Sequence, residues 1–318
     1  MKRRHFLKAT LALSIAGCSG PQEQADQDIP DPDGPSDARG SEEQGTILKF
    51  GVIADPQYAD QPDRGTRFYR NSLAKLSASV SDLNEYELDF VVTLGDVIDK
   101  DFASFSEIMP LYDQLWARHI AIPGNHDFDV DDADKHRVLP AMNITDSWHS
   151  ESLSGWRLLF LDGTDLSCYR YPADDDRTAA AEEELERLRE LELPNAKAWN
   201  SAIGEAQFSW LEEQLKESLD NKERVIVFCH FPVMPAGDAH NLWNANEVVE
   251  LLSRFDHVAA YMNGHNHGGN YARHNGCHFV NFKGMVETEV ETAYAVVSCF
   301  SDRIEIEGFG LEPDQNLS

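Results

Sequence analysis

The stretch Val225-Ile-Val-Phe-Cys-His-Phe-Pro232 of this 318-residue chain carries a histidine at the end of an apolar run. The stretch Tyr261-Met-Asn-Gly-His-Asn-His267 follows the same plan and ends in two histidines. Short apolar runs that end at turn residues are typical of buried strands. In open α/β sheets the carboxyl ends of the strands face the ligand. Both stretches therefore predict strands that deliver imidazoles to a ligand site.

Three earlier segments end in the same way but carry other donor groups. They are Ile53-Ala-Asp-Pro-Gln57, Leu94-Gly-Asp-Val-Ile-Asp99 and Pro123-Gly-Asn-His-Asp127. The five strand ends together offer two carboxylates, two side-chain amides and four imidazoles as donors. Hard and borderline divalent ions such as Mn²⁺, Mg²⁺, Fe or Zn²⁺ suit these oxygen and nitrogen ligands. The set predicts a hydrolytic site with two divalent metal ions.

No segment establishes this site alone. A Gly-Asp or Gly-Asn pair after a strand is most often only a turn, and a lone histidine in an apolar run is usually a core residue. His265 and His267 can share one side of a strand, although a spacing of two also arises by chance. The prediction depends on all five strand ends occurring in one chain.

Alternating apolar runs and helical spacings predict an α/β fold. Strands are expected at 47–54, 90–94, 119–122 and 156–161, from Val225 and Val258, and in hairpin-like runs at 277–282, 293–300 and 303–308. Helices are expected at 66–84, 102–118, 174–192, 204–215 and 247–254. We predict a four-layer α/β/β/α sandwich, in which helices flank two mixed sheets. The sandwich is expected to form one domain over residues 46–312, followed by a tail at 313–318.

Composition sets outer limits on function. Hydrophobic residues make up 42% of the chain, which is enough for a full core. The formal charge of -29 argues against nucleic acid as a partner, because a polyanion would be repelled. Beyond the N-terminus no stretch approaches 18 uninterrupted apolar residues, so no further membrane-spanning helix is predicted.

The N-terminus has the pattern of a targeting signal. Residues 1–18 place basic residues before a short apolar core, and the run Lys2-Arg-Arg-His-Phe-Leu-Lys8 resembles a twin-arginine export signal. Ile15-Ala-Gly-Cys18 resembles a bacterial lipobox. An ordinary signal peptide with a chance cysteine is the alternative. Residues 19–45 have the composition of a disordered acidic tether. We expect a protein outside the cytoplasm, in a bacterial periplasm or at the cell surface, with a membrane anchor through a lipid on Cys18.

The remaining cysteines follow no metal or redox spacing. No Cys-x-x-Cys pair occurs, which excludes zinc-ribbon and thioredoxin-like sites. Cys229 and Cys299 lie in apolar runs, where a thiol packs as a small hydrophobic group. A disulfide between Cys168 and Cys277 is left open.

The five segments carry a family resemblance. Asp-x-Gln, Gly-Asp-x-x-Asp, Gly-Asn-His-Asp, a strand-borne histidine and Gly-His-x-His resemble, in this order, the calcineurin-like metallophosphoesterases. The resemblance spans about residues 48–310. It implies one metal site formed by Asp55, Gln57, Asp96 and His267, and a second formed by Asp96, Asn125, His230 and His265. It also implies that Asp96 bridges both metals and that His126, oriented by Asp99, is the acid that faces the leaving group.

One departure narrows the resemblance to a branch. Most of the family has a histidine where this chain has Gln57. The segments 54–60, 65–70, 200–211, 268–271 and 280–288 resemble the manganese-dependent ADP-ribose/CDP-alcohol diphosphatases. That resemblance implies hydrolysis of the phosphoanhydride in nucleoside-diphosphate-linked compounds, with release of a nucleoside monophosphate.

Physical chemistry supports such a site independently. Two cations about 3.5–4 Å apart lower the pKa of a bridging water, so that hydroxide is available at neutral pH. A bridging carboxylate such as Asp96 would offset the repulsion between the cations. The neutral amide of Gln57 is a weaker donor than imidazole, so we expect a preference for Mn²⁺ over Zn²⁺. A protonated His126 can donate to the departing oxygen, and Asp99 can hold its tautomer.

Candidate substrate contacts are residues whose chemistry suits a nucleotide. Arg67 and Arg70 can bind phosphate through bidentate bonds, although arginines on helices are often only solvated. Other residues lie near the predicted metal ligands in the sequence or offer an aromatic ring for a base: Tyr58, Asn200, His240, Asn241, Trp243, Asn244 and Tyr271. The aromatic members of this set are equally compatible with a place in the core.

Two other functions remain compatible with the same residues. One is a cyclic-nucleotide phosphodiesterase or phosphomonoesterase on the same scaffold. The other is a non-catalytic phosphate- or nucleotide-binding lipoprotein, which a complete ligand set with His126 disfavours.

Overall fold

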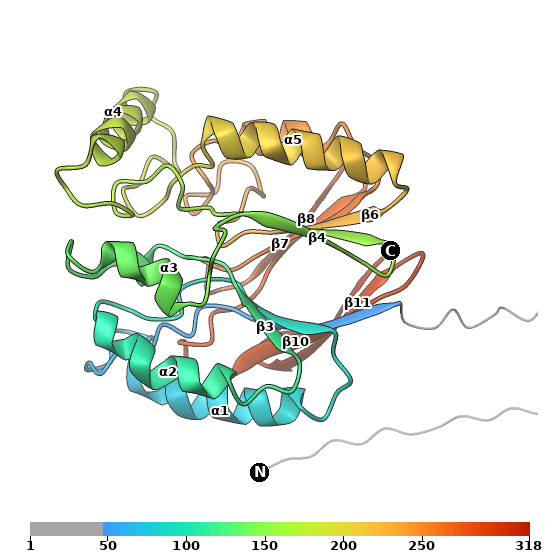
Figure 1. Cartoon of the computed structure of the whole chain (residues 1–318), viewed down its shortest axis with the longest axis horizontal. Coiled ribbons are helices and arrows are strands. Elements are labelled where there is room, and N and C mark those ends of the chain that lie inside the picture. The colour runs from blue at the N-terminus through green and yellow to red at the C-terminus, as the bar shows by residue number, and fades with distance from the viewer. Residues whose placement is uncertain (1–46) are drawn as a thin grey trace, which may run out of the picture. The chain divides into compact units, whose positions relative to one another are not determined.

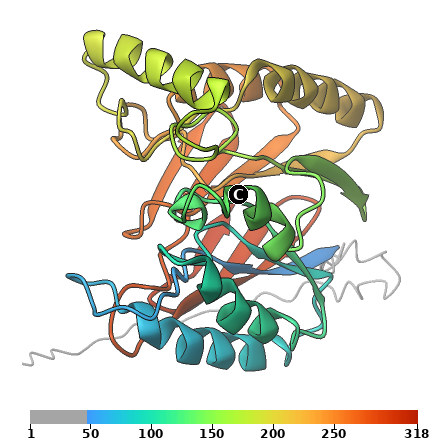
Figure 2. The same ribbon diagram turned by 60° about the vertical axis from the view of Figure 1, so that its left-hand side comes forward.

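Two mixed β-sheets lie face to face between helices in the computed structural model, which describes residues 47–318 (Figures 1 and 2). These residues all belong to one compact unit, Gln44–Ser318. The predicted export signal, lipobox and acidic tether fall on residues 1–46 and so lie outside the described residues. Within residues 47–318, no helix has the length and apolar character needed to span a membrane.

The first sheet has the strand order β12-β11-β10-β1-β2-β3. Its parallel half consists of β1 (Leu48–Ile53), β2 (Phe90–Thr93) and β3 (Arg118–Ala121). Its antiparallel half consists of β10 (Ala293–Cys299), β11 (Ile304–Gly310) and β12 (Gln315–Leu317). The carboxyl ends of the three parallel strands therefore share one edge of the sheet.

The second sheet has the strand order β4-β5-β6-β7-β9-β8. Its four central strands run parallel: β5 (Trp156–Phe160), β6 (Arg224–Phe228), β7 (Val258–Asn263) and β9 (Cys277–Asn281). Antiparallel strands close both edges, β4 (His149–Leu153) and β8 (Asn270–His274). The sequence did not predict β4 and β8, because edge strands are half exposed and carry no continuous apolar run.

Helices cover the outer faces of both sheets. The first sheet packs on α1 (Ser72–Leu83) and α2 (Phe105–Tyr112), and the second on α5 (Glu205–Asp220) and α6 (Ala245–Leu252). The charge-rich α4 (Asp176–Glu190) buries only a small apolar cluster, and α3 (Val138–Ala141) is a single turn. This arrangement confirms the predicted four-layer sandwich.

Burial on both faces explains why the central strands are apolar without interruption. In β6, Ile226 and Phe228 point into the core between the sheets, while Val225 and Val227 point toward the helices. Two stacked phenylalanine pairs fill the core between the sheets: Phe50 with Phe90 at 4.8 Å, and Phe160 with Phe228 at 5.0 Å. Alternating side chains thus serve two cores at once.

Several predicted boundaries differ from the structure. Helix α1 begins at Ser72 because residues 69–71 form a 3₁₀ turn, and α2 ends at Tyr112, well before residue 118. The predicted tail at 313–318 is wrong, since Gln315–Leu317 pairs with β11 and buries Leu317. Cys168 and Cys277 are free thiols in separate apolar clusters, so the disulfide that the sequence left open is not formed.

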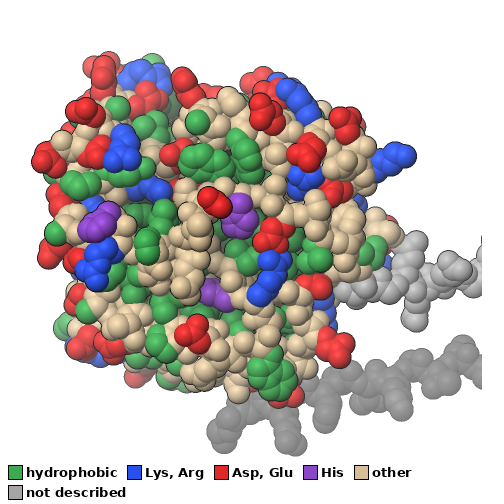
Figure 3. Space-filling model, viewed as in Figure 1, with side chains coloured by type: hydrophobic (Ala, Val, Ile, Leu, Met, Phe, Trp, Pro, Cys, Tyr) green, Lys and Arg blue, Asp and Glu red, His purple; other side chains and the backbone are tan. Residues whose placement is uncertain are grey.

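Acidic side chains are spread over the described surface. Figure 3 shows them across one face, with basic side chains scattered among them. The full chain carries a formal charge of -29. A basic side chain on this surface therefore has carboxylates close by with which it can form an ion pair.

Candidate metal centre

The loops after β1, β2 and β3 meet the loops after β6 and β7 where the two sheets adjoin. The backbone amide of His265 donates to the Asp55 carboxylate at 3.0 Å, and that of His126 donates to the Asp96 carboxylate at 2.8 Å. The amide of Gln57 donates to the carbonyl of Asp96 at 2.8 Å. Residues more than 200 positions apart in the sequence are thus bonded directly at this edge.

The structure brings the seven predicted metal ligands together. Two groups have ligand atoms within 4.8 Å of one another, Asp55–Asp96–His267 and Asp96–His230–His265, and Asp96 belongs to both. Gln57 adjoins the first group, with its Nε2 3.0 Å from Asp96 Oδ2. Asn125 adjoins the second group, with its Oδ1 3.2 Å from His230 Nε2. Each predicted site therefore has its four residues in one place.

Outer hydrogen bonds fix which nitrogen of each imidazole points inward. His230 Nδ1 donates to the carbonyl of Leu94 at 2.7 Å, so its Nε2 lone pair faces the centre. His265 Nε2 donates to Asn200 Oδ1 at 3.0 Å, so its Nδ1 lone pair faces the centre. The amide of Asn200 cannot flip, because its Nδ2 donates to two backbone carbonyls. A metal-binding histidine usually has such an outer acceptor for its second nitrogen.

The same pattern occurs at the other group. His267 Nδ1 donates to Glu287 Oε1 at 2.7 Å, which leaves Nε2 to face Asp55 at 3.5 Å. Gln57 Nε2 donates toward His267 Nε2 at 3.0 Å, while Gln57 Oε1 is buried without a hydrogen-bond partner. The amide nitrogen of Gln57 thus faces the ligand atoms, and an amide flip, which exchanges Oε1 and Nε2, would place the unpartnered oxygen there as a donor for a cation.

The inward lone pairs give a direct test of whether these residues fit a metal ion. His230 Nε2 and His265 Nδ1 lie 3.1 Å apart. Two lone pairs at this distance repel, so the pair needs a cation between them, either a proton or a metal ion. Burial lowers the pKa of His230, but the Asp96 carboxylate outweighs it and raises the pKa to about 9. Metal binding would therefore displace a proton, and the donor set fits divalent cations.

The backbone is strained where the ligands are attached. Asp55, Gln57 and Asp96 in the loops of the first sheet have φ of 51°, 45° and 52°, and His265 has φ of 69°. Residues other than glycine rarely adopt this left-handed region, and such residues cluster at functional sites. The strain is held by neighbouring backbone, since Val286 donates its N–H to the carbonyl of Asp55 at 3.0 Å.

Glycines allow the carboxylates to approach the backbone. A Cβ atom at Gly124 would lie 2.3 Å from Asp96 Oδ1, and one at Gly264 would lie 2.5 Å from Asp55 Oδ2. Both distances are too short for any side chain. The glycines of the Pro-Gly-Asn-His and Asn-Gly-His segments are therefore required by packing against the ligands.

Asp127 holds two ligand loops together, a role that the sequence did not reveal. Its carboxylate accepts hydrogen bonds from the backbone amides of four residues: Asp96, Val97, Ile98 and Gly124. The side chain is fully buried. It joins the loop after β2 to the loop after β3, and so fixes Asp96 relative to Asn125.

His126 faces away from the ligands toward a pocket. Its Nδ1 lies 3.1 Å from Asp99 Oδ1, which is within ion-pair distance, although neither atom has a partner in hydrogen-bond geometry. Its Nε2 lies 3.3 Å from Arg67 Nη1 and accepts from it, because a guanidinium can only donate. Burial lowers the pKa of His126, but Asp96 and Asp99 outweigh it, so that the pKa is raised.

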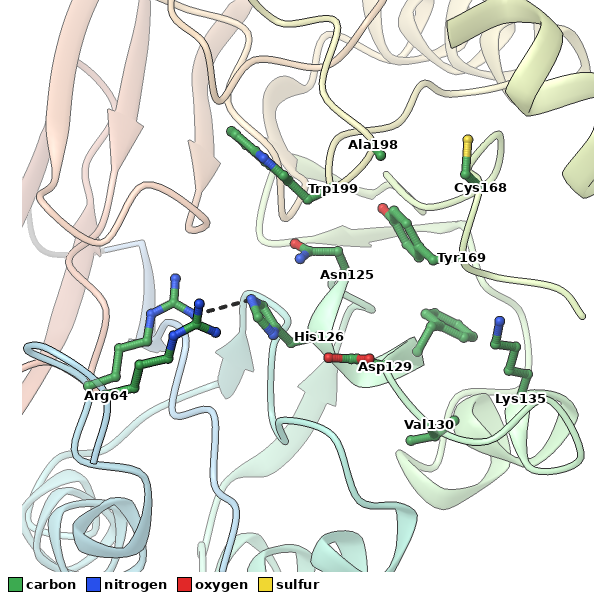
Figure 4. A pocket seen from close by; sticks show the side chains of 12 residues that line it. Arg64, Asn125, His126, Asp129, Val130, Lys135, Cys168, Tyr169, Ala198 and Trp199 are labelled. Atoms are coloured by element: carbon green, nitrogen blue, oxygen red, sulfur yellow. Dashed lines mark hydrogen bonds between the residues drawn. The ribbon is translucent and has the colours of Figure 1, made fainter. Parts of the chain in front are cut away.

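The pocket beside His126 has a volume of about 640 Å³ and two unlike ends. Figure 4 shows Arg64 on one side of His126, with Trp199 and Tyr169 across the pocket beyond Asn125. Trp199 is 39% exposed, and its ring centroid lies 5.3 Å from that of His265. The arrangement suits a ligand with an anionic part and a flat, less polar part.

Some predicted substrate contacts are in the pocket region and others are not. Arg67 lines the pocket, and His240 lies beside it, with its ring 5.2 Å from that of Trp199. Arg70 instead pairs with Asp60 at 2.6 Å and does not line the pocket. Asn200 is fully buried, supports His265 and does not line the pocket.

Two of the three predicted aromatic contacts, Tyr58 and Trp243, lie in the core and do not line the pocket. Tyr58 is 3% exposed and donates to Glu107 at 2.7 Å. Trp243 is 5% exposed, and its Nε1 donates to the carbonyl of Lys197 at 3.0 Å. The pocket is lined instead by Trp199, which directly precedes Asn200 in the sequence.

The remaining candidates are engaged in local structure. Tyr271 is exposed on β8, where its hydroxyl lies 2.9 Å from His278 Nδ1. The amides of Asn241 and Asn244 donate to the carbonyls of Pro235 and Ile203. None of the three lines the pocket beside His126.

Comparison with known proteins adds an independent finding. Residues 48–269 match the family model described as calcineurin-like phosphoesterase. The manganese-dependent ADP-ribose/CDP-alcohol diphosphatase of Arabidopsis thaliana is 27% identical over 301 residues, covering 85% of this chain and 96% of that protein. The human protein of the same name is 28% identical over 340 residues, covering 92% and 97%. The structure of a dimetal phosphatase from Danio rerio superposes with a TM-score of 0.78 at 25% identity, covering 86% of this chain and 99% of that one.

Proposed function

This chain belongs to the calcineurin-like phosphoesterase family, and from that premise we propose that it hydrolyses the phosphoanhydride bond of nucleoside-diphosphate-linked compounds. It is a metal-dependent hydrolase whose curated relatives are named for ADP-ribose and CDP-alcohols. Those names supply the proposed substrate class. The family relationship and the two-metal ligand set supply the reaction type.

The observation that carries the proposal is the inward convergence of donors around Asp96. Asp55, Gln57 and His267 would hold one divalent ion with Asp96, and Asn125, His230 and His265 would hold the other with it. When bound, two such ions acidify water and neutralise charge on a phosphoryl group. This chain's own contribution is to fix the donors by outer hydrogen bonds and strained backbone.

We assign His126 the role of proton donor to the departing phosphate oxygen. Asp99 Oδ1 lies 3.1 Å from Nδ1, and an ion pair with the protonated ring would hold Nε2 toward the pocket. Hydrolysis breaks the bond between phosphorus and the bridging oxygen. His126 Nε2, which accepts from Arg67 in this structure, must first bind a proton, which its raised pKa favours, and it can then deliver that proton to the oxygen on which charge develops. This role predicts a dependence on the leaving group, because an oxygen of low basicity needs little protonation.

The metal proposed for this centre is Mn²⁺. The curated relatives are named as manganese-dependent. The Gln57 amide offers a neutral donor of weaker field than an imidazole, and it disfavours Zn²⁺ more than Mn²⁺. Turnover measured at saturating Mn²⁺ and at saturating Zn²⁺ tests this assignment. A higher turnover with Zn²⁺ would refute it.

The unlike ends of the pocket support a nucleotide-type substrate. Trp199 is the proposed platform for the base, because its ring is exposed to the pocket and flanked by His240 and His265. Aromatic rings bind planar groups by stacking without requiring a particular base. The same platform would serve adenine and cytosine.

A substrate panel with products identified by mass tests the reaction. With Mn²⁺ added, we expect ADP-ribose to give AMP and ribose 5-phosphate, and CDP-choline to give CMP and phosphocholine. Cleavage of cyclic AMP alone would establish the phosphodiesterase alternative. Absence of turnover from protein shown to contain two metal ions per chain would establish the binding-protein alternative.

We also propose export and lipid attachment from the N-terminal sequence. The support is the run of basic residues in 2–8 and the Ile15-Ala-Gly-Cys18 motif. Expression in a bacterium followed by membrane fractionation tests it. Cys18→Ala should move the protein from the membrane fraction to the soluble fraction, and an unchanged distribution would refute lipidation.

A further inference from the structure

We propose that Arg64 and Arg67 form a clamp for the second phosphate of the substrate, and that this clamp selects diphosphate-linked compounds over compounds with a single phosphate. The inference rests on the proposed function and extends it to a determinant of specificity. The two residues end the tight turn Arg64-Gly-Thr-Arg67, which we call the arginine turn.

The backbone of the arginine turn directs both side chains to the same side. Arg64 N donates to the carbonyl of Arg67 at 3.0 Å, and Arg67 N donates to the carbonyl of Arg64 at 3.1 Å. This reciprocal pair is an antiparallel bridge, and directly opposed residues of such a bridge project on one face. Gly65 has φ of 64°, which permits the sharp turn. Figure 4 shows Arg64 beside the guanidinium that contacts His126.

The arginine turn is fixed relative to the metal ligands. Thr288 N donates to the carbonyl of Thr66 at 3.1 Å, and Arg67 forms a bridge with Glu287. Glu287 also binds His267 Nδ1 through its side chain. The segment that orients one predicted ligand thus also supports the turn. The arginine turn is therefore held in place by these contacts beside the candidate metal ligands.

The two guanidiniums have no carboxylate partner within the described chain. Most arginines between residues 47 and 318 pair with a carboxylate oxygen within 4.0 Å, but neither Arg64 nor Arg67 does. This is unusual on a surface with acidic side chains spread among the basic ones (Figure 3). Both line the pocket, so their charge is available to an incoming anion.

The position of the arginine turn favours the phosphate on the leaving side. Arg67 Nη1 lies 3.3 Å from His126 Nε2, the atom proposed to protonate the departing oxygen. In a diphosphate that oxygen belongs to a second phosphate, whereas in a monoester or a cyclic phosphate it belongs to an alcohol. Guanidinium groups bind phosphate through paired, charge-assisted hydrogen bonds. Only a diphosphate-linked substrate supplies the anion that these bonds need.

The test compares Arg64→Gln with a matched control, Arg273→Gln. Arg64 is exposed, so its replacement should leave the fold and the bound metal unchanged, which metal analysis and thermal unfolding verify. Arg273 is an exposed arginine on β8 that also has no carboxylate within 4.0 Å among the described residues, and it does not line the pocket. Both variants lose one positive charge, so a difference between them reports the position of the arginine and not the change in net charge.

The first measurement is a selectivity ratio, defined as kcat/KM for ADP-ribose divided by kcat/KM for bis(4-nitrophenyl) phosphate, which has one phosphate. We expect Arg64→Gln to lower this ratio about tenfold, the loss of one charged hydrogen-bonded contact, and Arg67→Gln to lower it further. Arg273→Gln should leave the ratio unchanged. An unchanged ratio in Arg64→Gln would overturn the clamp.

A binding measurement separates failure of the clamp from failure of the proposed function. Calorimetry gives Kd for α,β-methylene-ADP and for AMP with the Mn²⁺-loaded protein. The clamp predicts that Arg64→Gln weakens the diphosphate analogue about tenfold relative to AMP. Equal weakening of both, or of neither, refutes the clamp even where ADP-ribose is cleaved. Lack of ADP-ribose cleavage by the unmodified protein refutes the proposed function, while the two Kd values still decide whether the clamp exists.

Discussion

The two sheets supply different chemistry to the centre and fix it in different ways. The loops of the first sheet contribute the oxygen donors Asp55, Asp96 and Asn125, and two of these residues are held by strained backbone. The loops of the second sheet contribute imidazoles, each of which is held by an outer acceptor, although one of them, His265, also has a strained backbone. Carboxylates have short side chains, so the backbone must place them, whereas a longer imidazole can be oriented at its far nitrogen. The candidate metal centre therefore depends on both sheets, because its two kinds of donor meet where the sheets adjoin.

The most severe way to break this arrangement is to remove the carboxylate that both groups share. Asp96→Asn keeps the size of the side chain but removes the charge that offsets two cations, so we expect hydrolysis to fall about 10³-fold or more. Metal analysis should show fewer than two ions per chain. Asp113→Asn, at an exposed aspartate after α2, is the control and should change neither quantity. Full metal content with normal turnover would contradict a bridging role for Asp96.

His126→Ala tests whether catalysis can be lost while the metal ligands of both sheets stay intact. His126 faces the pocket, so both metals should remain bound while kcat falls about 10²–10³-fold. The loss should be larger for substrates with a more basic leaving oxygen. His136→Ala, at an exposed histidine outside this pocket, serves as the control. A loss of the same size for every leaving group would argue that His126 is not the proton donor.

Asn200→Ala tests whether an outer hydrogen-bond acceptor holds the imidazoles of the second sheet in place. Without Oδ1 of Asn200, the outer N–H of His265 loses its acceptor, and the ring is no longer held with Nδ1 inward. We expect Mn²⁺ affinity at one site to weaken about 10–100-fold. Activity titrated against Mn²⁺ measures this, and excess Mn²⁺ should restore turnover. Asn221→Ala, at an exposed position after α5, should leave the titration unchanged.

The sequence was sufficient for the parts of this molecule in which one local pattern determines the outcome. The apolar runs at β1, β2, β6 and β7 predicted buried strands, and the residues after them predicted a ligand set that the structure brings together. Burial on both faces forces such runs to be continuous. The order of ligand types along the chain then indicated which strand ends must meet.

The sequence was insufficient where a residue's role depends on contacts across the fold. Asn200 and Glu287 orient histidines that are distant in the sequence, so their own neighbours in the chain give no sign of it. Trp199 and Trp243 are similar in local composition, but only packing puts Trp243 into the core and Trp199 beside the pocket. The short strand β12 was taken for a tail, because three residues carry no periodic pattern.

A last contact joins the two sheets near the centre, and its replacement should affect stability more than catalysis. Glu312, after β11 of the first sheet, accepts a hydrogen bond at 2.7 Å from the backbone amide of Lys283, after β9 of the second. Burial raises the pKa of Glu312 from 4.5 to about 7. Between these values the folded chain retains a proton that the unfolded chain has released. The free energy of unfolding of the wild type therefore falls as pH rises from 4.5 to about 7, and it levels off above that value.

Glu312→Gln cannot ionise, yet its amide oxygen can still accept from Lys283. We expect the variant and the wild type to have similar free energies of unfolding near pH 4.5, and the variant to be more stable by about 2 kcal/mol at pH 8. Urea denaturation of the metal-free protein at both pH values measures this, with the exposed Glu250→Gln as control. Turnover at saturating Mn²⁺ should be unchanged, because no predicted ligand contacts Glu312. An equal difference at both pH values would show that Glu312 is ionised throughout, and the two sheets would then be joined by a charged rather than a neutral carboxyl group.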